Sequence, residues 1–524
     1  MSDATMSIQA GSEAPASSSP TTVSLRGRAA AAVILAVDLG VLGDVLLRAP
    51  SLGLNFTLWW WSVIAAAAWL ARSSGIPLTR RRAALFLAAA AFAALPSIRA
   101  AEEIVLLTCI AVGTLLVLAA WTGGAPGVSL GHSPLTAYLR AVSATVFHGL
   151  RGPFPLLSAE AKAFETVRER HVTQWAAIIR GLALAAPIVL VFTMLLVAAD
   201  PSFEGIVKGA FSWDAETVAS HGILFAVFGW VAAAYFCATL SPWDASPAQA
   251  SKPLLGLIEA NTVLAAIDAL FLAFMLAQLR YLFGGADHVL STAGLTYAEY
   301  ARRGFFELTT VTALALPLLV AIFAATEPRS ATQARMRRAL SLTLILLLVG
   351  MIASALWRMR LYEQMYGWTI QRLYATAFML WIAGTLAWFA RTTLRDRAER
   401  FVLGPLVGGL GVIALFGVAN PAGAVVDINA QRAVAGADFD GAYAASLRED
   451  AIPSLVRVLP AVAPSLDARE RCAVMRAIDA ARDPSRPRGG WRGANLSLVR
   501  ARRAIGANWA AIERSLGSPA CPSG

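Results

Sequence analysis

Residues 104–121 read IVLLTCIAVGTLLVLAAW, a run without a single charged side chain. An α-helix rises about 1.5 Å per residue and the hydrocarbon core of a bilayer is about 30 Å thick, so such a run nearly crosses it. Similar apolar blocks, separated by short polar segments, recur along the chain. The pattern predicts membrane-spanning helices.

The composition agrees with this interpretation. Of 524 residues, 57% are hydrophobic and 15% are charged. Soluble proteins have roughly 45–50% apolar and about 25% charged residues, so both values indicate a chain that uses lipid as its solvent. An ordinary soluble globular protein is excluded.

Eleven apolar runs are long enough to span the bilayer. They cover residues 29–47, 54–71, 83–98, 104–121, 176–199, 218–240, 258–283, 304–326, 338–357, 370–390 and 401–418. The sequence therefore predicts an all-α, polytopic transmembrane helix bundle with about 11 spans. Gly404 and Gly408 in the last run indicate close helix packing.

Basic residues predict the orientation, because loops rich in Lys and Arg stay in the cytoplasm. With an inner N-terminus, the inner loops hold Arg72, Arg80, Arg81, Arg82, Arg140, Arg151, Lys162, Arg168, Arg170, Lys252, Arg329, Arg335, Arg337, Arg338, Arg391, Arg395, Arg397 and Arg400. The outer loops hold only Arg48, Arg99, Lys208, Arg302, Arg303, Arg358 and Arg360. We expect an N-in, C-out topology, which in a bacterium would place the C-terminal region on the outer side of the inner membrane.

The predicted organisation has five parts. Residues 1–24 are a disordered cytoplasmic tail without a signal peptide, 25–121 hold spans 1 to 4, 122–175 form a basic cytoplasmic loop, 176–418 hold spans 5 to 11, and 419–524 form a small helical extracytoplasmic domain. The amphipathic stretch 135–151 is either a solvated part of the inner loop or a helix on anionic lipid headgroups.

Several functional classes lack support in the sequence. The net charge of +11 comes from arginine clusters between apolar runs, so we expect no nucleic-acid partner. The four cysteines have no metal-ligand spacing, and we predict neither a metal nor a cofactor. Whether Cys472 and Cys521 pair depends on an oxidising compartment and stays open. No nucleotide-binding, hydrolase or kinase motif is present.

Polar residues inside the apolar runs are candidate sites, because a charge in the middle of a bilayer costs about 2.5–3.5 kcal/mol. Asp38 and Asp268 lie at central depth and are candidates for a proton relay or ion site, although Asp38 could equally make a structural contact between helices. The full intramembrane set is Asp38, Asp44, Asp268, Gln278 and Glu307.

The outer loops hold a second candidate site. Glu299, Arg303 and Glu307 fall at helical spacing and could form a charge ladder that only locks the loop onto the bundle. Alternatively, arginines bind phosphate or carboxylate in an aromatic-walled anion pocket. The hypothetical ligand-binding residues are Arg302, Arg303, Arg358, Arg360, Arg372, Tyr362 and Tyr366.

Several motifs resemble an uncharacterised bacterial polytopic family, the domain of unknown function 4173. They are QLRYLFGG at 278–285, TYAEYARRGFFEL at 296–308, DPSF at 200–203, RLY at 360–362 with YGWT at 366–369, NP at 420–421, DIN at 427–429 and DAIPSL at 450–455. The resemblance covers the chain from the fifth span onward. It implies a multi-pass protein with a C-terminal helical domain and brings no activity.

Three functions remain open. The first is a non-enzymatic sensor or scaffold that binds an envelope protein or an anionic ligand at the outer face. The second is an ion- or proton-coupled transporter that uses Asp38 and Asp268, against which the two halves show no clear internal repeat. The third is a membrane-embedded transferase on a lipid-linked substrate, with Asp44 or Glu299 as base. We expect the first, and the sequence assigns no catalytic residue.

Overall fold

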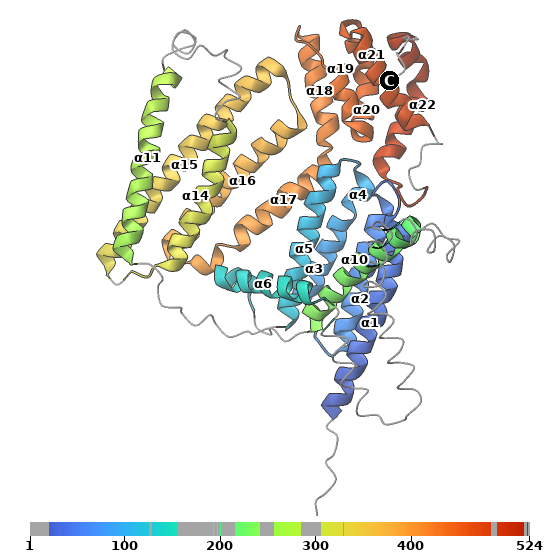
Figure 1. Cartoon of the computed structure of the whole chain (residues 1–524). Coiled ribbons are helices and arrows are strands. Elements are labelled where there is room, and N and C mark those ends of the chain that lie inside the picture. The colour runs from blue at the N-terminus through green and yellow to red at the C-terminus, as the bar shows by residue number, and fades with distance from the viewer. Residues whose placement is uncertain are drawn as a thin grey trace, which may run out of the picture. The chain divides into compact units, whose positions relative to one another are not determined.

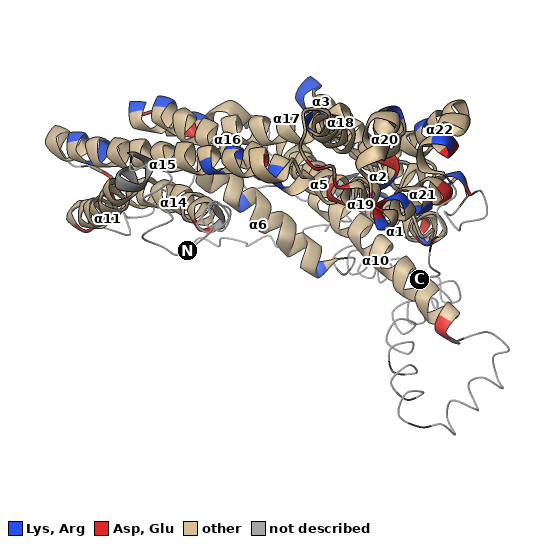
Figure 2. Cartoon of the chain, turned by 90° about the horizontal axis from the view of Figure 1, so that it is seen from above, with Lys and Arg blue, Asp and Glu red and all other residues tan. Residues whose placement is uncertain are grey.

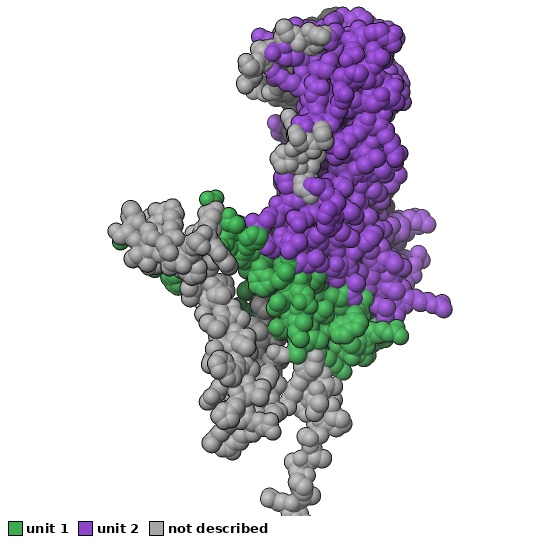
Figure 3. Space-filling view, turned by 90° about the vertical axis from the view of Figure 1, so that its right-hand side faces the viewer, with its two compact units in different colours: residues 1–41, 66–77, 148–240 green, residues 42–65, 78–147, 241–524 purple. Residues whose placement is uncertain are grey.

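The computed structural model of the chain describes residues 20–124, 128–152, 215–240, 256–283, 305–328, 330–483, 490–517 and 521, with single positions at 154, 192, 196 and 200. The chain divides into two compact units (Figure 3). Unit 1 holds residues 1–41, 66–77 and 148–240, and unit 2 holds residues 42–65, 78–147 and 241–524.

The described residues form helices and no strands. The α-helices are α1 (Pro20–Leu47), α2 (Leu54–Ser73), α3 (Arg80–Ala93), α4 (Leu95–Ile98), α5 (Glu102–Gly124), α6 (Leu135–Arg151), α10 (Ala215–Leu240), α11 (Leu257–Phe283), α14 (Phe305–Ala325), α15 (Ala331–Tyr366), α16 (Ile370–Thr392), α17 (Leu403–Ala419), α18 (Pro421–Val434), α19 (Gly441–Ser446), α20 (Arg448–Val462), α21 (Ala468–Arg482) and α22 (Leu496–Leu516). Short 3-10 turns cover Leu130–His132, Thr393–Arg395, Ala398–Arg400 and Ala463–Ser465.

Within the described residues, ten helices are long and apolar enough to cross a membrane. They coincide with ten of the eleven predicted runs, which confirms those runs as helices of spanning length. The remaining predicted span, 176–199, lies outside the described residues apart from two positions. The runs could be predicted because each one forms its helix from its own residues. In lipid, a single apolar segment can satisfy its backbone hydrogen bonds internally only as a helix.

In unit 1, α1 and α10 approach closely at glycines. A side chain at Gly229 of α10 would bring its Cβ within 3.3 Å of the Ala36 carbonyl oxygen on α1. Small residues at such a crossing allow two backbones to pack. Trp230, one residue further on, donates its indole N–H to the Gly149 carbonyl at 2.8 Å.

In unit 2, helices α11, α14, α15, α16 and α17 cross the same layer one after another (Figure 1). Helices α11, α15 and α17 run in one direction, while α14 and α16 return. The core that α11, α14, α15 and α16 share contains Leu264, Leu319, Leu344, Leu348 and Leu386, all fully buried. A continuous aliphatic and aromatic interface of this kind holds spanning helices together by close packing.

The prediction that Gly404 and Gly408 support close packing fits the α16–α17 contact. A Cβ at Gly404 would overlap the Trp388 indole of α16. Trp388 and Trp381 donate their ring N–H groups to the carbonyls of Phe401 and Pro405 at 3.1 and 2.9 Å. The absence of a side chain at Gly404 therefore leaves room for a tryptophan of the neighbouring helix.

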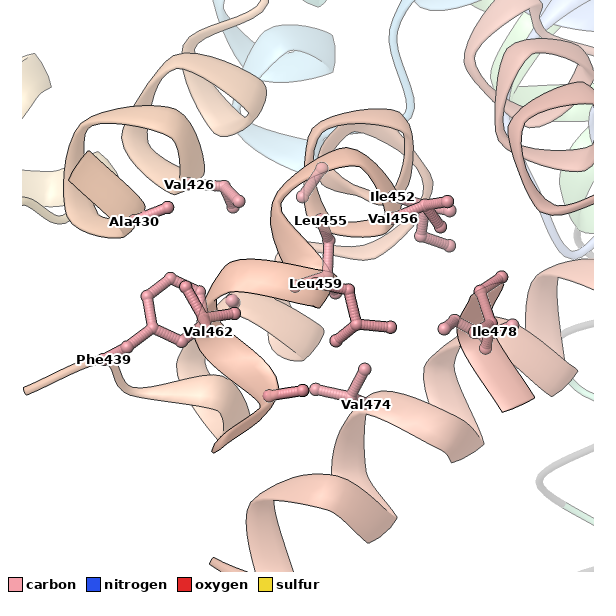
Figure 4. Close-up of a cluster of buried hydrophobic side chains, with 14 of the residues drawn as sticks. Val426, Ala430, Phe439, Ile452, Leu455, Val456, Leu459, Val462, Val474 and Ile478 are labelled. Atoms are coloured by element: carbon pink, nitrogen blue, oxygen red, sulfur yellow. The ribbon is translucent and has the colours of Figure 1, made fainter. Parts of the chain in front are cut away.

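Helices α18 to α22 form a separate core, which we call the C-terminal cluster. Side chains of α18, α20 and α21, including Val426, Leu455, Leu459, Val474 and Ile478, gather at its centre (Figure 4). Figure 2 shows Arg, Asp and Glu together over α19 to α22, whereas α14 to α16 are mostly tan. Cys472 and Cys521 form a disulfide. The sequence had left open whether these two cysteines pair.

Helix α6 coincides with the amphipathic stretch predicted at 135–151. One row of apolar side chains on it is exposed, at Leu139, Val142, Val146 and Leu150. Tyr138, on another face, is buried, and its hydroxyl donates to the Leu130 carbonyl at 2.5 Å. Burial raises the pKa of Tyr138 to about 12.

Candidate functional site

A buried ion pair joins the C-terminal cluster to the spanning helices. Arg99, in the turn between α4 and α5, faces Asp450 of α20 with 3.7 Å between Nη1 and Oδ1. Their side chains are 5% and 3% exposed, so neither charge is shielded by water. Removing one partner from such a pair leaves an uncompensated buried charge. We call this pair and its neighbours Asn420 and Ser497 the Arg99–Asp450 clamp.

Asp450 forms hydrogen bonds with several segments of the chain. Its Oδ2 accepts the backbone N–H groups of Ala100 and Ala101 at 2.8 and 2.9 Å, immediately before α5 begins. Its Oδ1 accepts the Ser497 hydroxyl, and its backbone carbonyl accepts the Asn420 amide at 2.9 Å. The Asp450 carboxylate therefore caps α5 and links α20 to α22, while the Asp450 backbone carbonyl holds the α17–α18 junction.

Arg99 completes the clamp from the other side. Its guanidinium donates to the carbonyls of Gly417 and Val418 at 3.0 and 2.5 Å, at the end of α17. These carbonyls are among those that a helix end leaves without an intrahelical partner. Burial lowers the pKa of Arg99, while the Asp450 carboxylate acts in the opposite direction.

A cavity of about 290 Å³ opens beside the clamp, and we call it the clamp cavity. Four helices begin around it: α5, α16, α18 and α20. Helix N-termini carry partial positive charge and attract anionic groups. The wall consists of Arg99, Ala101, Glu102, Glu103, Ile104, Ile370, Gln371, Tyr374, Asn420, Pro421, Ala422, Tyr443, Ser446, Leu447, Arg448 and Asp450.

Two tyrosines, Tyr374 and Tyr443, line the clamp cavity. The Tyr443 hydroxyl accepts the Ile370 backbone N–H at 2.8 Å and so caps α16. Burial raises the pKa of Tyr443, so its phenol stays neutral. The Tyr374 hydroxyl is buried and has no hydrogen-bond partner. A buried polar atom without a partner is costly, and a ligand in the cavity could satisfy it.

The backbone of the cavity wall includes two residues in the left-handed region. Asn420 has φ +51° and Arg448 has φ +59°. This region costs roughly 1–2 kcal/mol for a residue with a side chain, less for Asn. Asn420 recovers part of the cost by accepting the Gly423 N–H at 3.3 Å and capping α18. Strained residues gather at functional sites more often than elsewhere.

A larger cavity of about 740 Å³ shares Glu102 and Arg448 with the clamp cavity. These two residues form an ion pair at 2.6 Å, and both side chains are mostly exposed. The larger cavity is walled by Leu52 and Val105 on one side and by Ile452, Ala477 and Leu498 on the other. The exposed Glu102–Arg448 ion pair therefore borders both cavities.

The predicted arginine site is brought together only in part. The Arg372 guanidinium lies 4.1 Å from the centre of the Tyr362 ring, and the Tyr362 and Tyr366 rings are 5.0 Å apart. Arg372 also donates to the Gly367 carbonyl. Arg358 and Arg360 belong to the last turns of α15, where Arg360 is exposed. Arg302 and Arg303, like Glu299, lie outside the described residues.

The sequence did not predict two features near the turn between α15 and α16. Glu363 is buried next to the predicted arginines, and its Oε1 lacks a hydrogen-bond partner. The Asn429 amide pairs with the backbone of Trp368, accepting its N–H at 2.8 Å and donating to its carbonyl at 2.9 Å. The motif DIN at 427–429 signalled Asn429, but only the fold shows which backbone it holds.

The intramembrane residues have different surroundings. Asp44 forms an ion pair with Arg48 one helical turn later, at 2.6 Å. Asp38 is exposed on α1, and Glu307 is exposed in the first turn of α14. Asp268 is 7% exposed, and neither carboxylate oxygen has a hydrogen-bond partner. The side chain of Gln278 lies outside the described part.

Across the residues that the structure describes, no group of three or more His, Cys, Asp or Glu side chains is arranged to hold a metal ion. The single carboxylate of the clamp, that of Asp450, instead binds backbone N–H groups, a hydroxyl and a guanidinium.

The ten apolar helices in the described residues define a multi-pass membrane protein. The chain belongs to the family described as domain of unknown function (DUF4153), whose model matches residues 86–458. The resemblance to family 4173 was therefore wrong in its number, although a family of unknown function was correctly expected. The match also begins earlier than expected, within α3. No curated protein and no solved structure matches the chain.

Proposed function

We propose that this chain is a multi-pass protein of the bacterial inner membrane that binds a ligand or partner at its outer face and acts as a sensor or scaffold. In this proposal the N-terminus is inside, and the C-terminal cluster lies outside. Two observations support the orientation. Arginines concentrate in the loops assigned to the cytoplasm, and the Cys472–Cys521 disulfide suits an oxidising compartment.

The clamp cavity is the observation on which the proposal rests. Its wall combines the starts of α5 and α16 with the starts of α18 and α20 of the C-terminal cluster. A ligand there would contact both parts and change how firmly they hold each other. Because binding to one arrangement stabilises that arrangement, occupancy would be passed to the C-terminal cluster without any reaction.

The cavity favours a small ligand with a carboxylate or phosphate group. Helix N-termini supply positive potential, and the Tyr374 hydroxyl supplies a free hydrogen-bond donor. The rim also holds Glu102 and Glu103, which would repel a second negative charge. A ligand with one anionic group and a polar remainder meets both conditions.

The test is to purify the full chain in lipid discs and identify copurifying molecules by native mass spectrometry. Tyr374→Phe removes only the unpartnered hydroxyl, and Gln431→Ala on the exposed side of α18 is the control. We expect an anionic ligand that is lost from Tyr374→Phe and kept by Gln431→Ala. A ligand kept equally by both variants, or no ligand and no protein partner at all, would overturn the proposal.

A further inference from the structure

Asp268 occupies the middle of α11 on the side that packs against α15. It shares one helical face with Leu264, Phe271 and Met275, which belong to the core of the spanning helices. The residue is 7% exposed, and both carboxylate oxygens lack a hydrogen-bond partner. An ionised carboxylate at this position would have neither water nor a counter-charge beside it.

The facing surface of α15 can be located from one contact. A Cβ at Gly350 would lie 3.2 Å from the Met275 methyl group, so these two residues are level. Helices α11 and α15 run in the same direction (Figure 1). Seven residues earlier on each helix, Asp268 is therefore level with Thr343. The Thr343 hydroxyl already donates to the Ala339 carbonyl at 3.1 Å.

No charged residue of α15 lies at the level of Asp268. The stretch 339–357 contains no ionisable side chain. The charged groups of α15 stand at its two ends, and the Arg337 guanidinium is engaged by the Thr326 carbonyl at 2.7 Å. These groups are Arg335, Arg337, Arg338, Arg358, Arg360 and Glu363. On α11 itself, Glu259 accepts the Gly256 N–H at 2.8 Å in the first turn, and Arg280 follows three turns after Asp268.

A bound metal cation does not fit this environment. Hard cations need about six oxygen ligands. The nearest other polar atom on the same face of α11 is Asn261 Oδ1, two helical turns away and likewise without a partner. Since a lone carboxylate cannot remain ionised in an apolar helix interface, the remaining ligand is a proton.

We propose that Asp268 is a proton-binding site in the membrane interior, neutral while α11 packs on α15. Loss of the proton requires water or a counter-charge at the carboxylate, so α11 must separate from α15 or rotate. Proton binding at Asp268 thereby sets the packing of α11. This inference is independent of the clamp cavity and would stand if that cavity proved empty.

A hydrophobic carbodiimide tests the proton directly. A protonated carboxyl group adds across the C=N bond of dicyclohexylcarbodiimide, and the adduct rearranges to a stable N-acylurea that keeps every atom of the reagent. The full chain in lipid discs is treated over a pH series, and peptides are mapped by mass spectrometry. We expect modification of Asp268 at neutral pH that falls about tenfold for each pH unit once the site begins to lose its proton.

Two controls sharpen the result. Asp44, which forms an ion pair with Arg48, should stay unmodified under the same conditions. Asp268→Asn has the shape of the neutral acid and should keep the fold while losing the labelled peptide. The wild-type pH profile is decisive even if this variant does not fold. Absence of label at Asp268 at every pH, or protection by sodium ions at constant pH, would overturn the proposal.

Discussion

The Asp450 carboxylate lies 3.7 Å from the Arg99 guanidinium, and both side chains are almost fully buried. Asp450 follows Ala100, whose backbone it also binds, by 350 positions in the sequence. A single carboxylate thus ties the first third of the chain to the C-terminal cluster. We therefore expect the clamp to be sensitive to mutation.

Asp450→Ala should destabilise the chain by about 3–5 kcal/mol, because it leaves the Arg99 charge buried and α5 without its cap. The effect should show as a lower thermal midpoint and as faster proteolysis of the C-terminal cluster. The control is Asp438→Ala, which removes an exposed carboxylate before α19. Equal midpoints for both variants would mean that the clamp does not hold the cluster.

Cys521→Ser should lower the stability of the C-terminal cluster by about 2–4 kcal/mol, because the disulfide closes a long loop back to Cys472. Dithiothreitol should reproduce the loss in the wild type and change the variant little. Alkylation of the unfolded, unreduced chain should label Cys109 and Cys237 alone. Labelling of all four cysteines before reduction would contradict the disulfide.

Asn429→Ala should cost about 1–3 kcal/mol, because two backbone groups of Trp368 lose their partner in a half-buried turn. Hydrogen exchange should accelerate at Trp368 and at the start of α16. Gln431→Ala, on the exposed side of α18, is the matched control and should leave exchange unchanged. Unchanged exchange in Asn429→Ala would show that the turn holds without this amide.

Tyr138 should make stability depend on pH in the alkaline range. Its pKa is raised to about 12 in the folded chain and is about 10 when unfolded, so the folded state favours the neutral phenol. The contribution is complete below about pH 10 and is lost as the pH rises toward 12, a change of about 2–3 kcal/mol. Unfolding measured from pH 9 to 12 should show this slope in the wild type and not in Tyr138→Phe.

The spanning helices could be predicted because their signal is local. A run such as 104–121 specifies its own helix by length and hydrophobicity, whatever it packs against. The amphipathic stretch 135–151 was predictable for the same reason. The C-terminal helices followed from apolar residues at helical spacing around Ile452 and Val474.

The clamp could not be predicted because its members carry no local signal. In the sequence, Arg99 is one basic residue in a short predicted loop, and Asp450 is one acidic residue near the start of a predicted helix. Their pairing depends on how distant segments pack. Asp268 was identifiable as an intramembrane carboxylate, but its lack of any partner required the α11–α15 interface. Of the arginine site, the structure describes the contacts of Tyr362 with Arg372 and with Tyr366.

The clamp also affects how the protein is made. Arg99 leaves the ribosome long before Asp450, and synthesis of the 350 residues that follow Ala100 takes roughly 20–70 s at bacterial rates. During that time the guanidinium must rest on water, headgroups or a chaperone, because its permanent partner does not yet exist. Completion of the C-terminal cluster would therefore act as the final checkpoint of biogenesis, and truncated chains would expose an unpaired arginine to membrane quality control.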